Sequence, residues 1–203
     1  MSNAEFHNEF YKEFDGIYRL RVPFDTVYTS VLLITAEKNI LVDCATTDAD
    51  VDTCIVPALS SMGYSLSDID TLVLTHKHGD HAGGRARILA LAPHIEVVTG
   101  VTDICKDIST YPMSGHTPDC IGVLDMRTRT LLSGDGLQGA GVDKYRCSLT
   151  DKVAYLETVE RVKNDIRVEN ILFSHAYEPW YTDRAVGRET VLKSLADCVE
   201  CVK

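Results

Sequence analysis

The chain has 203 residues, of which 45% are hydrophobic and 25% are charged, and both values are ordinary for a globular protein. Its formal net charge of −10 argues against a nucleic-acid partner, because nucleic-acid surfaces draw most of their affinity from basic patches. No apolar run approaches the roughly 20 residues of a membrane-spanning helix, and the polar, acidic start does not resemble a signal peptide. We therefore expect neither a nucleic-acid partner nor a membrane partner.

The cysteines, seven in number, are scattered along the chain. An odd set without secretory context is typical of reduced thiols, so we expect a cytoplasmic protein. Cys198 and Cys201 have C-x-x-C spacing, but they lie in a helical pattern at the chain end and are most simply two helix residues. The length predicts a single domain over residues 1–203, with residues 1–16 as an N-terminal extension whose role the sequence does not indicate.

In the first half of the chain, apolar and β-branched runs predict strands at residues 17–22, 27–35, 39–43 and 71–75. Residues 48–62 have a helical pattern, which Pro57 interrupts and Gly63 closes. A second helix is expected over residues 85–92, before Pro93.

In the second half, strands are expected at residues 95–98, 121–125, 130–133 and 170–174. Ser148 to Asp151 resembles a capping box and predicts the start of a helix. A final helix is predicted over residues 183–200. Because both halves contain strands and helices, the pattern favours two sheets packed together with helices outside, a four-layer α/β arrangement.

The stretch HKHGDH, residues 76–81, combines imidazole and carboxylate side chains within a short loop. The first two histidines are two residues apart, so they point to the same side of an extended segment. Gly79 allows the backbone to turn sharply, and the aspartate and histidine after it can then face a second point nearby. One loop can therefore serve two adjacent metal ions. These ligands suit Zn²⁺, Fe or Mn, and the absence of cysteine disfavours a closed structural zinc site.

Other polar side chains stand at or near the ends of apolar strands, where α/β proteins commonly build their sites. These residues are Asp43, His116, Asp135 and His175. The cluster alone could be a polar surface loop or a metal-free His/Asp pair, but the additional residues make a metal centre the better interpretation.

The full set resembles the metallo-β-lactamase-fold hydrolase superfamily, whose hallmark H-x-H-x-D-H follows a short apolar strand as HKHGDH does here. Asp43 matches the first family motif, and the later motifs match Gly115-His116-Thr117-Pro118, Ser133-Gly134-Asp135 and Ser174-His175. The matches run in family order over roughly residues 17–200. The resemblance implies the αββα sandwich of the metallo-β-lactamase fold.

The resemblance also implies a site with two divalent metal ions, zinc foremost, with iron or manganese as alternatives. It assigns one ion to His76, His78 and His116. It assigns the second ion to Asp80, His81 and His175, with Asp135 bridging the two ions and Asp43 supporting the site from behind. The implied reaction is hydrolysis of a small ester, thioester, lactone or phosphoester by a metal-bridging hydroxide, with Asp80 and Asp135 as catalytic carboxylates.

Departures from known subfamilies narrow this expectation to a minimal, single-domain, glyoxalase-II-like enzyme. Asp135 stands where the largest class of dizinc β-lactamases has cysteine, and Gln138 stands where acyl-homoserine lactonases have tyrosine. The chain ends soon after His175, so we expect no glutathione-binding C-terminal domain.

Two segments are expected to border a pocket for a small-molecule substrate. They contribute the candidate contacts Lys144, Tyr145, Arg146, Tyr177 and Trp180, although ordinary loop positions would explain each of them equally well. The alternative activity is a mononuclear non-haem iron dioxygenase of the persulfide dioxygenase type, which shares the fold and could use His76, His116 and Asp135. A non-catalytic metal-binding protein is a third interpretation. The sequence does not indicate the oligomeric state.

Overall fold

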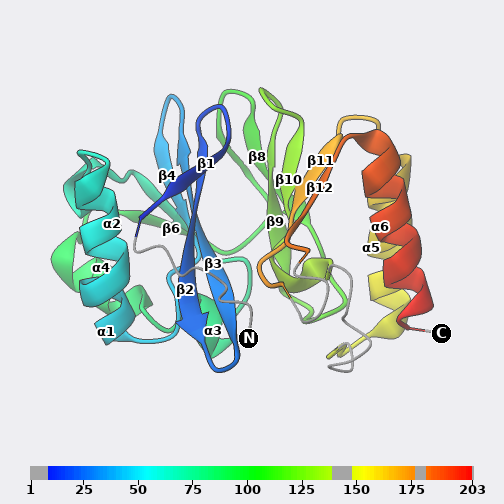
Figure 1. Ribbon diagram of the computed structural model, residues 1–203, viewed down its shortest axis with the longest axis horizontal. Coiled ribbons are helices and arrows are strands. Elements are labelled where there is room, and N and C mark those ends of the chain that lie inside the picture. The colour runs from blue at the N-terminus through cyan, green and yellow to red at the C-terminus, as the bar shows by residue number, and fades with distance from the viewer. Residues whose placement is uncertain (1–8, 139–147, 177–181, 203) are drawn as a thin grey trace. The chain divides into compact units, whose positions relative to one another are not determined.

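The computed structural model describes residues 9–138, 148–176 and 182–202. The chain divides into two compact units, Met1–Thr99 and Gly100–Lys203, and each contains one six-stranded sheet (Figure 1). That the two units act as one domain stays a prediction. Within the described ranges, no helix combines the length and the apolar character needed to cross a membrane.

The sheet of the N-terminal unit has the strand order β1-β2-β3-β4-β5-β6. Its strands are β1 (Tyr11–Phe14), β2 (Ile17–Phe24), β3 (Val27–Thr35), β4 (Asn39–Val42), β5 (Thr71–Val73) and β6 (Glu96–Val98). The first four strands pair antiparallel, whereas β4, β5 and β6 run parallel. Because β4 and β5 are parallel neighbours, the residues that follow them emerge at the same edge of the sheet. Strand β1 lies within residues 1–16, the segment predicted as an N-terminal extension, so part of that extension belongs to the sheet.

The helical segments of this unit are α1 (Asp48–Asp50), the π-helical turn η1 (Val51–Ile55), α2 (Val56–Ser61), the 3₁₀ turn η2 (Leu66–Asp68), α3 (Gly79–Ala82) and α4 (Arg85–Leu91). Of these, α1, α2 and α4 cover one face of the sheet (Figure 1). Pro57 does not break the expected helix, because Val51–Ile55 form a π turn and the proline follows it in the first turn of α2. Gly63 ends this region with φ of 81°, in agreement with the prediction.

The sheet of the C-terminal unit has the strand order β12-β11-β10-β9-β8-β7. Its strands are β7 (Asp103–Cys105), β8 (Ile108–Pro112), β9 (Ile121–Asp125), β10 (Thr130–Leu132), β11 (Asn170–Leu172) and β12 (Arg184–Val186). A 3₁₀ turn, η3 (Gly134–Gly136), follows β10. Helices α5 (Lys152–Asn164) and α6 (Arg188–Glu200) lie side by side (Figure 1) and pack on an apolar core that includes Tyr155, Val159, Ile171, Phe173 and Leu195.

Two helix starts differ from the sequence-based expectation. The N-cap of α5 is Asp151, whose side chain accepts hydrogen bonds from the backbone N–H groups of Val153 and Ala154, rather than Ser148. The last helix begins at Arg188, because residues 184–186 pair with β11 as a strand. The side chains of this short strand are alternately exposed and buried. The prediction treated residues 183–200 as one helical pattern, and three alternating residues are too few to stand out in it.

Candidate metal centre

The edge where β4 and β5 end carries a buried network centred on Asp43. Asp43 follows β4 with φ of 62°, a conformation that is uncommon for a residue other than glycine. Its Oδ1 accepts the backbone N–H of Thr75 at 2.8 Å, and its Oδ2 accepts the Thr75 hydroxyl at 2.8 Å. Both side chains are buried, so this carboxylate is held from two directions directly behind the predicted ligands.

This network sets the tautomers of two predicted ligands. His81 Nδ1 lies 2.7 Å from Asp43 Oδ2, and because a carboxylate only accepts, Nδ1–H donates and the lone pair is on Nε2. The Thr75 hydroxyl uses its single hydrogen on Asp43, so at 3.1 Å it accepts from His76 Nδ1–H. Both imidazoles therefore present Nε2 as the metal-binding atom. Thr75 was not among the predicted site residues. Its position directly before His76, at the end of an apolar strand, was the feature of the sequence that could have indicated its role.

The HKHGDH loop turns differently from the prediction. His78 is extended, with φ of −60° and ψ of 148°, and the helix α3 starts directly after it. Gly79 has no positive φ, and a Cβ atom added to it would meet no atom within 4 Å. The chain does change direction at Gly79 as predicted, but it does so without the conformational freedom of glycine. The start of a helix, which any residue at this position allows, redirects the chain.

The four predicted ligands of the loop gather at one place in the N-terminal unit. The ring of His76 lies with its centroid 4.6 Å from that of His78 and 4.2 Å from that of His81. Asp80 Oδ2 lies 3.2 Å from His81 Nε2, the nitrogen that carries the lone pair. A carboxylate oxygen and an imidazole nitrogen at this separation can bind one ion together.

The glycine pair after the loop is required by close backbone packing. A Cβ atom on Gly83 would lie 1.8 Å from the Thr46 carbonyl oxygen, and one on Gly84 would lie 2.3 Å from the Cys44 carbonyl oxygen. The Cys44 N–H donates to the His81 carbonyl at 2.8 Å, which ties the same two segments together. The absence of side chains on the glycines thus allows the backbone of His81 to sit against the loop after β4.

The C-terminal unit brings together the other three predicted ligands around one carboxylate. Asp135 Oδ2 lies 3.6 Å from His116 Nε2, and Asp135 Oδ1 lies 3.3 Å from His175 Nε2. All three side chains are at most 9% exposed. Each oxygen of Asp135 therefore faces a different imidazole, which is one arrangement in which a carboxylate can bridge two ions.

The start of α5 holds the loop that carries His116. The Ser148 carbonyl accepts a hydrogen bond from His116 Nδ1, so Nε2 carries the lone pair, as in His76 and His81. The backbone N–H groups of Thr150 and Asp151 donate to the Gly115 carbonyl, each at 3.0 Å. Gly115 has φ of 141°, and a Cβ atom there would lie 2.5 Å from the Tyr155 Cα atom. Ser148 contributes through its backbone, so its side chain gave no signal in the sequence.

The donor set of each unit fits a divalent metal ion. Imidazole nitrogens and carboxylate oxygens suit zinc, iron and manganese, and neither group contains a cysteine. His76, His81 and His116 each have Nδ1 engaged by an oxygen, which is the usual support for a histidine that binds metal through Nε2. Binding of metal by these residues stays a prediction.

We predict that Asp43→Asn weakens metal binding about 10- to 100-fold. An amide that keeps its oxygen toward Thr75 N–H presents its NH₂ group to His81 Nδ1–H and to the Thr75 hydroxyl, so His81 loses its acceptor. Competition with a chromophoric zinc chelator measures the affinity. Asp52→Asn, which removes an exposed carboxylate paired with Arg87, is the matched control and should bind zinc as the wild type does. Equal affinity of Asp43→Asn and wild type would contradict the supporting role.

The predicted substrate contacts Lys144, Tyr145, Arg146, Tyr177 and Trp180 lie outside the described residues. Gln138, which precedes one of these segments, is described and is 6% exposed. Its side-chain oxygen has no hydrogen-bond partner within the described part of the chain. A buried unpaired acceptor costs about 1–3 kcal/mol, so this oxygen is a polar atom for which the described residues supply no partner.

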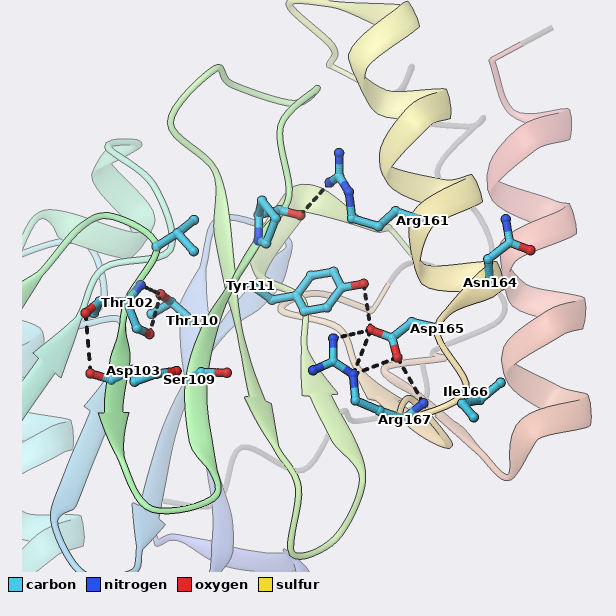
Figure 2. A pocket seen from close by; sticks show the side chains of 12 residues that line it. Thr102, Asp103, Ser109, Thr110, Tyr111, Arg161, Asn164, Asp165, Ile166 and Arg167 are labelled. Carbon is cyan, nitrogen blue, oxygen red and sulfur yellow. Dashed lines mark hydrogen bonds and ion pairs between the residues drawn. The ribbon is translucent and has the colours of Figure 1, made fainter.

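An open pocket of about 930 Å³ lies elsewhere in the C-terminal unit and contains none of the predicted ligands (Figure 2). Its walls are residues 101–103, 109–112 and several residues near the end of α5. Asp165 accepts hydrogen bonds from Arg167 and from the Tyr111 hydroxyl, and the Arg167 guanidinium is the main reason that the pKa of Asp165 falls to about 2. Burial raises the pKa of Tyr111 to about 12. The polar side chains of Tyr111, Asp165 and Arg167 in this pocket are thus paired with one another.

Known proteins resemble the chain in sequence. The sequence profile of the Metallo-beta-lactamase superfamily matches residues 24–99, the part that holds Asp43 and the HKHGDH loop. The Beta-lactamase-like protein 2 homolog of Drosophila melanogaster is 30% identical over 173 residues, which cover 71% of this chain and 56% of that protein. The Atrochrysone carboxyl ACP thioesterase of Claviceps purpurea (strain 20.1) is 24% identical over 144 residues, which cover 63% of this chain and 44% of that protein. The chain spans about half the length of these curated relatives.

Solved structures resemble the chain in fold. The crystal structure of the metallo-beta-lactamase FIM-1 from Pseudomonas aeruginosa in its mono-zinc form aligns with a TM-score of 0.71 at 17% identity, over 95% of both chains. At this identity the likeness concerns the fold alone, and it confirms the predicted metallo-β-lactamase fold, in which helices flank two mixed β-sheets. The sequence matches show that the chain belongs to the metallo-beta-lactamase superfamily, whose members are largely metal-dependent hydrolases.

Proposed function

We propose that this protein is a dinuclear metal-dependent hydrolase that cleaves a small ester or thioester, with lactones and phosphoesters as further candidates. The observation that carries the proposal is the Asp135 carboxylate, which directs one oxygen to His116 and the other to His175. Such a carboxylate suits a ligand shared by two ions better than a ligand of one ion. The thioesterase named among the relatives supports the acyl substrate.

In this proposal the first ion is held by His76, His78 and His116. The second is held by Asp80, His81 and His175, and Asp135 bridges the two. Zinc is the first choice for both ions, because the donor set suits it and because the aligned structure of FIM-1 contains it. Ions bound in this way would supply a water nucleophile at neutral pH and would polarise the substrate oxygen.

The remaining work falls to the protein's own residues. Asp80 and Asp135 each contribute one negative charge and thereby lower the net charge of the ions without cancelling it. Asp43 and Thr75 keep His81 and His76 in the tautomer that exposes Nε2, so these rings need no reorientation when an ion binds. No serine or cysteine nucleophile is required for hydrolysis of this kind.

We place the reaction in the cytoplasm. The cysteines within the described ranges have free thiols, and those of Cys44, Cys120 and Cys198 are buried. Burial raises the pKa of Cys44 to about 12 and that of Cys120 to about 11, which keeps both in the unreactive thiol form. Free thiols are typical of a reducing compartment.

The proposal is tested by counting metal ions and assaying a substrate panel on the same preparation. We expect two ions of zinc, iron or manganese per chain, and hydrolysis of p-nitrophenyl esters or thioesters above lactones and phosphodiesters. Stripping the ions with a chelator should abolish turnover, and adding zinc should restore it. One iron per chain with substrate-dependent oxygen uptake would overturn the hydrolase in favour of the dioxygenase.

A further inference from the structure

Asp80 has a hydrogen-bond partner in β3, distant from it along the chain. The Thr29 hydroxyl donates to Asp80 Oδ2 at 3.3 Å. Thr29 is fully buried, and it lies on the same face of β3 as Val31 and Leu33, which belong to the apolar core beneath the helices. Valine would fill this position with the same shape and without a buried hydroxyl, so packing alone does not explain a threonine here.

The bond from Thr29 selects one orientation of the Asp80 carboxylate. The terminal torsion of an aspartate is broad, so a contact is needed to hold the plane of its carboxylate in one orientation. Oδ2, the atom that accepts from Thr29, is also the atom 3.2 Å from His81 Nε2. Thr29 therefore holds a predicted ligand oxygen beside the imidazole nitrogen with which it would share an ion.

We infer that Thr29 is a positioning residue for the ion held by Asp80 and His81, and that it leaves the other ion unaffected. The inference rests on the proposed function, because it requires these two side chains to bind metal. Partners of this kind typically change metal affinity about 10- to 100-fold. The distance of 3.3 Å is long for an O–H···O hydrogen bond, so we expect an effect near the lower limit, about 10-fold.

The test compares three variants of the full chain by titrating the metal-free protein with zinc against a chromophoric chelator. Thr29→Val removes the hydroxyl and keeps the shape, whereas Thr29→Ser keeps the hydroxyl. Thr71→Val is the matched control, because Thr71 is a fully buried residue of β5 whose hydroxyl has no hydrogen-bond partner within the described residues. Unfolding of the metal-free proteins in urea detects any general loss of stability.

We expect Thr29→Val to bind one of two zinc ions about 10-fold more weakly and the other as the wild type does. Thr29→Ser and Thr71→Val should each retain both wild-type affinities. The inference is overturned if Thr29→Val keeps both affinities, if it weakens both ions equally, or if Thr29→Ser loses as much as Thr29→Val.

Failure of the proposed function gives a different result. A wild-type chain that binds two ions but cleaves no substrate in the panel contradicts the hydrolase and leaves the role of Thr29 in place. A wild-type chain that binds one ion contradicts the dinuclear site. In that case the role of Thr29 is supported if Thr29→Val weakens that ion and is overturned if it does not.

Discussion

Replacing Asp135 with alanine is expected to release both metal ions and to reduce hydrolysis by more than 100-fold, beyond the roughly 10- to 100-fold effect of an outer-shell partner. The reason is that Asp135 faces His116 with one oxygen and His175 with the other, so in the proposed site its loss removes a ligand from each ion. The fold should survive, because Asp135 lies in the η3 turn outside the apolar core. Metal analysis after dialysis, turnover and circular dichroism measure the three outcomes.

Two histidine variants make this prediction specific to a bridging carboxylate. His175→Ala should lose one ion and retain the other, since His175 is assigned to a single ion. His94→Ala removes an exposed histidine away from the predicted ligands and should keep both ions and full turnover. If Asp135→Ala retained one ion at wild-type affinity, Asp135 would be a ligand of one ion only, and the bridging assignment would be wrong.

Gly83→Ala is expected to destabilise the protein by roughly 3 kcal/mol or more, the upper part of the range for overpacking. A Cβ atom there would lie 1.8 Å from the Thr46 carbonyl oxygen and 2.5 Å from the Gly79 carbonyl oxygen, and backbone atoms cannot move aside as a flexible side chain does. The two segments must separate, and His81 must move with them, so zinc affinity should fall together with the urea unfolding midpoint.

Gly79→Ala is the matched comparison, because it makes the same change at the first residue of α3, whereas Gly83 caps the other end of that helix. Its added methyl group meets no atom within 4 Å, and its backbone is outside the positive-φ region. We expect wild-type stability or a gain of up to about 1 kcal/mol from the stiffer unfolded chain. Similar unfolding midpoints for Gly83→Ala and Gly79→Ala would show that the close packing at Gly83 is not required.

The sequence by itself determined the family, the strand-end placement of the predicted ligands, and their division between the two halves of the chain. Each of these features can be recognised in a short stretch of sequence, because a predicted ligand is a particular side chain close to the end of an apolar strand. Parallel pairing of β4 and β5 then brings Asp43 and the HKHGDH loop to one edge. The sequence-based predictions differ from the structure where one local pattern is compatible with two conformations. Gly79 starts a helix and does not use a positive φ, and residues 184–186 form a strand where a helix was predicted.

Apart from Asp43, the groups that support the predicted ligands were decided only by the tertiary structure. The Thr29 hydroxyl reaches Asp80 across 51 positions of sequence, and the Ser148 carbonyl reaches His116 across 32. A buried threonine in a strand resembles any other β-branched residue, and a backbone carbonyl is common to every residue, so neither leaves a pattern in the sequence. Their roles depend on which segments the fold places in contact, and this is also why Gly83 is needed while Gly79 is not.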